Sequence, residues 1–173
     1  MSRRRKVSST FLFVATICSI ILLGVNSTCA VDMAPDFTLP DLEGRNITLS
    51  SNRGKVVIVN FWGTWCEPCK AEMPSLNRLY LESRDKGLVV LAVSIDPSSQ
   101  KVRSFITQKG YSFPVLLDSK KEVFFDTYGL FGLPVSVIID RSGVIVQKVI
   151  GEAAWDAPPI KGKIQKLLDG RKI

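Results

Sequence analysis

The alternation of apolar and polar positions separates an apolar N-terminal stretch from a mixed region that begins near Val31. Within the mixed region, residues 56–62 and 88–95 form nearly continuous apolar runs that are rich in β-branched side chains. Such runs are typical of strands that are buried on both faces of a sheet. A shorter apolar run at 112–117 predicts a third strand.

Two further patterns predict hairpins. Residues 135–140 and 144–150 are apolar runs joined by Arg141-Ser142-Gly143, the clearest turn signal in the chain. Residues 34–39 and 46–49 alternate apolar and polar positions around a polar turn, which predicts a short N-terminal hairpin.

Helical spacing of apolar side chains, closed by glycines such as Gly87 and Gly110, predicts the helices between these strands. The predicted helices cover residues 69–85, 99–109, 120–128 and 160–168. Strands that alternate with helices are joined by crossovers into a parallel core, and the last hairpin adds antiparallel strands at one edge. The sequence therefore predicts one α/β domain at 33–173, with a central mixed sheet flanked by helices.

The first 30 residues predict export. A basic cluster, Arg3 to Lys6, precedes the apolar run 11–25, as in a secretory signal peptide. Small residues before a cut after Ala30 favour cleavage, whereas an apolar run from Val7 onward is just long enough to serve as an N-terminal membrane anchor. Lipidation at Cys29 is a third possibility, although the residues before it lack the usual pattern. We expect a periplasmic or other extracytoplasmic domain, soluble after cleavage or anchored by this segment.

The composition excludes several kinds of function. The net charge is +7, but four of the positive charges lie in the N-terminal basic cluster, and no Lys/Arg stripe with interleaved aromatic residues predicts nucleic-acid binding. The chain contains no histidine, which removes the commonest metal ligand and the usual base that activates a cysteine.

The candidate chemistry lies in Cys66-Glu67-Pro68-Cys69, where the strand 56–62 gives way to a helix. A pair with this spacing is half a zinc site, a structural disulfide or a redox couple. Zinc needs about four ligands, and the domain holds no histidine and no second cysteine pair. A disulfide that closes so short a loop stabilises a fold little. The redox interpretation is favoured, because a helix N-terminus stabilises a thiolate.

Two local signals disagree about where that helix begins. Thr64 and Glu67 have the spacing of a capping box, but Pro68 fits better inside the first turn, with the cap after Thr64. In either case Cys66 lies at the helix edge and Cys69 one turn inside. We therefore expect Cys66 to attack a substrate disulfide and Cys69 to resolve the mixed disulfide.

Glu72 lies three residues after Cys69 and hence on the same side of the predicted helix. Two interpretations are open from the spacing: Glu72 exchanges a proton with Cys69, or it is a surface acid near a helix N-terminus. Glu67 is expected to be exposed and to tune the dithiol.

Several ordered motifs between residues 33 and 152 resemble the TlpA/ResA/CcmG group of extracytoplasmic thioredoxin-like proteins. They are Ala34-Pro-Asp-Phe37, Val59-Asn-Phe-Trp62, Trp65-Cys-Glu-Pro-Cys69, Glu72-Met-Pro74, and Gly132-Leu-Pro134 before Ile138-Ile-Asp140. The resemblance implies a thioredoxin fold with an N-terminal β-hairpin extension.

The resemblance also implies roles for individual residues. Pro134 is expected to follow a cis peptide bond and to face the dithiol, and Glu72 corresponds to an acid that ResA-like proteins carry. Trp65, Glu67, Pro68 and Leu133 are expected to tune the dithiol or to contact the substrate. Val135 departs from the threonine often found after that proline, and Asn60 occupies the place of the buried acid of thioredoxins.

The function implied is a thiol-disulfide oxidoreductase that reduces protein disulfides through Cys66 and Cys69. The resemblance implies the Cys-x-x-Cys disulfide of apocytochrome c as substrate, in cytochrome c maturation, and a membrane thiol-disulfide transporter as electron donor. We expect a monomer with no cofactor beyond its redox-active disulfide and no metal. Two alternatives are a general disulfide oxidase, since direction depends on reduction potential, and a metallochaperone or copper-site assembly partner.

Overall fold

The computed structural model describes residues 32–171 of the protein. The predicted export segment, residues 1–30 with Cys18 and Cys29, lies outside the described residues. Within 32–171, no helix is long and apolar enough to cross a membrane.

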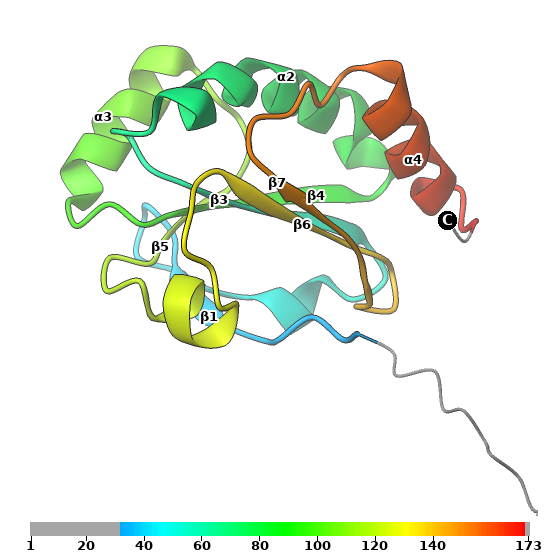
Figure 1. Cartoon of the computed structure of the whole chain (residues 1–173), viewed down its shortest axis with the longest axis horizontal. Coiled ribbons are helices and arrows are strands. Elements are labelled where there is room, and N and C mark those ends of the chain that lie inside the picture. The colour runs from blue at the N-terminus through cyan, green and yellow to red at the C-terminus, as the bar shows by residue number, and fades with distance from the viewer. Residues whose placement is uncertain (1–31, 172–173) are drawn as a thin grey trace, which may run out of the picture. The chain divides into compact units, whose positions relative to one another are not determined.

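A five-stranded mixed sheet forms the middle of the domain (Figure 1). Its strands, in spatial order, are β5 (Val115–Leu117), β4 (Leu88–Ser94), β3 (Val56–Trp62), β6 (Val135–Ile139) and β7 (Ile145–Ile150). The strands β3, β4 and β5 are parallel, whereas β6 is antiparallel to β3, and β7 is antiparallel to β6. The predicted parallel core with an antiparallel hairpin at one edge is confirmed.

The central strand β3 separates two apolar layers, because successive side chains of a strand point to opposite faces of the sheet. Its even-numbered apolar residues pack with side chains of three helices, which lie together on one face in Figure 1. These helices are α2 (Glu67–Ser83), α3 (Ser99–Lys109) and α4 (Pro158–Leu168). The odd-numbered residues pack with the N-terminal hairpin and with the segment around Phe124. All seven residues of β3 are buried, as its composition predicts.

Helix α3 has the bounds that the sequence predicts, and its ends show why. The Ser98 side chain accepts the N–H of Lys101 at the start, and Gly110 ends the helix with a φ of 66°, a conformation that glycine adopts at little cost.

Two segments differ from the prediction. The predicted helix at 120–128 is a shorter π-helical turn, η3 (Val123–Thr127), and it begins later because Lys121 has a φ of 63°, outside the helical region. The Asp118 carboxylate accepts the N–H groups of Val123 and Phe124 and so fixes the start of this turn. The predicted strand at 112–117 is shorter, since Pro114 has no N–H to donate to a ladder and only Val115–Leu117 pair with β4.

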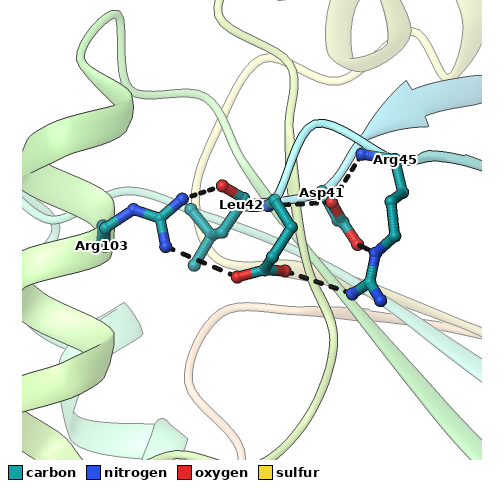
Figure 2. Close-up of polar contacts among 5 residues, drawn as sticks. Asp41, Leu42, Arg45 and Arg103 are labelled. Carbon is teal, nitrogen blue, oxygen red and sulfur yellow. Dashed lines mark hydrogen bonds and ion pairs between the residues drawn. The ribbon is translucent and has the colours of Figure 1, made fainter.

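The predicted N-terminal hairpin consists of β1 (Thr38–Pro40) and β2 (Asn46–Thr48). Its turn is closed by Asp41, whose carboxylate accepts the backbone N–H of Arg45 at 2.8 Å and the Arg45 side chain at 2.8 Å. Arg103 of α3 donates to the carbonyl oxygen of Leu42 in the same turn (Figure 2). Asp41 also forms a bridge with Leu116, so the hairpin turn covers the edge strand β5.

Candidate functional site

The Cys66–Cys69 pair lies where β3 ends and α2 begins. Cys66 is the N-cap of α2, and Glu67 and Pro68 are its first two helical residues. The predicted cap after Thr64 is confirmed, and the capping box at Thr64 is wrong. Proline is tolerated in this first turn because its missing N–H would have no partner inside the helix.

The two sulfur atoms form a disulfide and differ in their surroundings. Cys66 is 6% exposed and lines a surface cleft, whereas Cys69 is fully buried in the apolar layer beneath. The backbone N–H of Cys69 donates to Cys66 Sγ at 3.3 Å. A helix N-terminus that directs an N–H at this sulfur favours its thiolate form once the disulfide is reduced.

Thr64 holds the loop before the dithiol through Asp96, a residue that the sequence reasoning missed. The Asp96 carboxylate accepts the Thr64 backbone N–H at 2.8 Å, the Thr64 hydroxyl at 2.6 Å and the Ser94 hydroxyl at 2.9 Å. Asp96 follows the end of β4, beside β3 in the sheet. The sequence did offer a signal for Asp96, because it is an acid directly after a buried strand. The carboxyl ends of the parallel strands β3 and β4 meet at one edge of the sheet, where the dithiol loop begins.

Glu72 is buried, with only 2% of its surface exposed, so its interpretation as a surface acid is wrong. Its Oε1 accepts from Asn60 Nδ2 at 2.7 Å. Its Oε2 accepts the backbone N–H of Ala153 at 3.0 Å and the indole N–H of Trp155 at 3.2 Å. The segment between β7 and α4 therefore closes over the carboxylate from a distant part of the chain.

Burial raises the pKa of Glu72 above its ordinary value, and hydrogen bonds from Asn60, Ala153 and Trp155 offset this only in part. The negative charge of Glu152 acts in the same direction as burial. A buried carboxyl group with a raised pKa, one turn along the helix from a cysteine, is suited to accept and return a proton.

Asn60 connects Glu72 to the neighbouring strand. Its Nδ2 also donates to the hydroxyl oxygen of Ser136 on β6 at 2.8 Å, while its Oδ1 is buried with no hydrogen-bond partner among the described residues. Asn60, which occupies the place of the buried acid of thioredoxins, is thus a neutral hydrogen-bond donor to Glu72.

The peptide bond between Leu133 and Pro134 is cis, as the resemblance implies. Val135 pairs with Phe61 in the β6–β3 ladder, which places Pro134 next to the end of β3 from which the dithiol loop departs. Leu133 lines the same cleft as Cys66.

That cleft has a volume of about 470 Å³ and joins two parts of the chain. The predicted residues Trp65, Glu67 and Pro68 line it beside Cys66, whereas Cys69, Glu72 and Pro134 do not reach it. The rest of the lining was missed by the sequence reasoning, and half of it is aromatic: Phe124, Phe125 and Phe131, with Ile95, Lys121 and Gly132. Aromatic residues before and within the Gly129–Pro134 loop were the available signal.

Within residues 32–171, no group of three or more His, Cys, Asp or Glu side chains is placed to hold a metal ion.

Comparison with known proteins gives concordant matches. The model of the AhpC/TSA family matches residues 30–148. The thiol-disulfide oxidoreductase ResA of Bacillus thuringiensis (strain Al Hakam) is 40% identical over 134 residues, which cover 78% of this chain and 76% of the relative. ResA of Bacillus subtilis (strain 168) is 35% identical over 156 residues, covering 86% of this chain and 87% of the relative.

A solved structure resembles the fold throughout the domain. It is that of a proposed thiol:disulfide interchange protein DsbE from Chlorobium tepidum, with a TM-score of 0.74 and 33% identity, covering 80% of this chain and 96% of that one.

Proposed function

This chain belongs to the AhpC/TSA family and is a thiol-disulfide oxidoreductase, and we propose that it works outside the cytoplasm as a reductant of protein disulfides. The observation that carries the exchange chemistry is the unequal placement of the two sulfur atoms, whereas the direction and the location rest on the similarity to ResA. Cys66 lines the cleft, while Cys69 is fully buried one helical turn away.

The exchange follows from this placement. The Cys66 thiolate attacks one sulfur of the substrate disulfide, a Cys66–substrate bond forms, and the other substrate sulfur leaves as a thiolate. Cys69 then loses its proton and attacks Cys66 Sγ, which releases the second substrate thiolate and forms the Cys66–Cys69 disulfide. Two electrons pass from the dithiol to the substrate.

Glu72 is the proposed acceptor of the Cys69 proton. The carboxyl group is buried, its pKa is raised, and it lies three residues from Cys69 on α2. A base in this position allows the buried thiol to become a nucleophile without histidine, which the chain lacks.

The proposed substrate is the Cys-x-x-Cys disulfide of apocytochrome c, and the proposed electron donor is a membrane thiol-disulfide transporter. The resemblance of the ordered motifs to the TlpA/ResA/CcmG group and the alignment with ResA support this choice. We propose that the protein needs no cofactor beyond its own disulfide.

The reduction potential of the dithiol tests the direction. We expect equilibration with glutathione or dithiothreitol buffers to give a value near that of thioredoxin, about −270 mV, and the reduced protein to reduce a disulfide-bonded apocytochrome c peptide. A potential near about −120 mV, with transfer of the disulfide to reduced substrates, would identify a disulfide oxidase instead.

A further inference from the structure

Large apolar side chains are left in solvent around the cleft. The most exposed of them is Phe131, with 88% of its surface accessible, and Trp65 and Phe125 follow with 60% and 42%. All three line the cleft that contains Cys66. Exposed apolar groups that gather at one place indicate a surface that contacts a partner.

Two of these three aromatic side chains pack against neighbouring rings. Phe125 lies in η3, whose start is fixed by Asp118, and it packs edge-on against Phe124 with ring centroids 4.9 Å apart. Phe131 lies beside Phe125, with ring centroids 6.1 Å apart. Rigid aromatic groups contribute contact area at a low cost in conformational entropy.

Charge is sparse in the lining of the cleft. Glu67 and Lys121 are its charged residues, and Glu67 is paired with Lys70 at 2.5 Å. Selection of a partner at this surface therefore rests on apolar contact.

We propose that Trp65, Phe125 and Phe131 form an aromatic mouth that selects partner segments carrying a bulky apolar side chain next to the reactive cysteine. The occupant follows from the chemistry, because any partner must bond its sulfur to Cys66 inside this cleft and its neighbouring residues must lie against the lining. This inference deepens the proposed exchange reaction and rests on it.

Phe131 provides the sharpest test, because its exposure makes Phe131→Ala harmless to the core. The substrates are symmetric disulfides of one capped pentapeptide with Leu, Ser, Asp or Lys beside its cysteine. The reduced full-length protein is mixed with each, quenched with acid and separated by chromatography. We expect the wild type to react fastest with the Leu peptide, and Phe131→Ala to slow that reaction about fivefold to tenfold while changing the Ser peptide little.

Two controls separate recognition from reactivity. Oxidised 2-mercaptoethanol has no side chain to fill the mouth, and its rate with Phe131→Ala should equal that of the wild type. Leu81→Ala removes a 43% exposed apolar side chain near the far end of α2 and should leave all rates unchanged. Phe125→Ala should reproduce the loss of the Leu preference.

Three results would overturn the inference: equal rates for the four peptides, a faster reaction with the Asp or Lys peptide, or an equal slowing of all substrates by Phe131→Ala. The proposed direction is tested separately by the potential, which does not affect the ratio between peptides. A failure of one is therefore distinguishable from a failure of the other.

Discussion

At the scale of single residues, the surroundings of Glu72 define its chemistry. Its carboxylate oxygens accept hydrogen bonds from the Asn60 amide, the Ala153 backbone N–H and the Trp155 indole N–H. Donors of this kind stabilise the carboxylate, whereas burial favours the protonated acid, and burial is the larger effect on the pKa. Burial and these donors thus act in opposite directions on the pKa of Glu72, and the net effect is a raised pKa.

Replacing Glu72 by Gln should slow disulfide exchange at neutral pH, because Cys69 loses its proton acceptor. We expect the resolving step, followed as decay of the mixed disulfide, to slow about 100-fold, and the pH profile of the Cys69 thiol to move. Glu152→Gln is the matched control, since Glu152 influences Glu72 only through its charge. Unchanged thiol titration and exchange rates in Glu72→Gln would remove Glu72 from the mechanism.

At the scale of elements, the loop between β3 and α2 is held from β4. The Asp96 carboxylate accepts both the backbone N–H and the hydroxyl of Thr64, which lies two residues before Cys66. The spacing of Thr64 and Glu67 offered a capping box as one of two conflicting signals, because the sequence shows local spacing only. In the structure the Thr64 hydroxyl instead donates a hydrogen bond to Asp96, 32 positions later in the chain.

Removing this acid in Asp96→Ala should lower the free energy of unfolding by about 2–3 kcal/mol, since buried donors lose a charged acceptor. Because the loop carries Cys66, the pH midpoint of its alkylation in the reduced protein should also move.

Asp140→Ala is the control for Asp96. Asp140 closes the turn before β7 in the same way, accepting Ser142 N at 2.9 Å, the Ser142 hydroxyl at 2.6 Å and Val144 N at 2.9 Å. Asp140→Ala should lower the free energy of unfolding but should leave the pH midpoint of Cys66 alkylation unchanged. A Cys66 titration unchanged in both variants would show that Asp96 serves the fold alone.

The elements themselves were largely predictable, because each rests on local signals. The buried strand 56–62, the helix capped by Ser98 and Gly110, and the turn at Arg141 to Gly143 lie as expected. The failures have local causes that a periodicity does not reveal. The left-handed backbone of Lys121 and the missing donor of Pro114 shorten their elements.

At the scale of the whole molecule, the site is assembled from segments that are far apart in sequence. Ser75 of α2 accepts the N–H of Trp155 at 3.1 Å, and Arg78 pairs with Asp156 at 2.7 Å, so the segment before α4 is fixed along the helix that carries the dithiol. The cysteines could be predicted from their spacing. Asp96 and Phe131 had only indirect signals, and Trp155 had none, since no short motif links these residues to Cys66.

The stability of the folded protein should depend on pH through Glu72. A carboxyl group whose pKa is raised by folding contributes stability below its unfolded pKa, near 4.5, and this contribution is lost as the pH rises through the folded value. Relative to Glu72→Gln, the wild type should therefore lose stability from pH 4 to pH 8, by about 1.4 kcal/mol for each unit by which folding raises the pKa.

Urea unfolding of the oxidised protein across this range measures the effect. Glu152→Gln, compared with the wild type, should show a smaller change. A constant difference between wild type and Glu72→Gln at all pH values would mean that folding does not shift the pKa of Glu72.

The central claim is that Cys66 attacks and Cys69 resolves. Its most direct test is to mix reduced Cys69→Ala with a disulfide-bonded apocytochrome c peptide and to identify the adduct by mass spectrometry after acid quenching. The account predicts a stable mixed disulfide on Cys66, and no adduct on Cys69 when Cys66→Ala is treated in the same way. An adduct on Cys69 in Cys66→Ala, or none in Cys69→Ala, would contradict it.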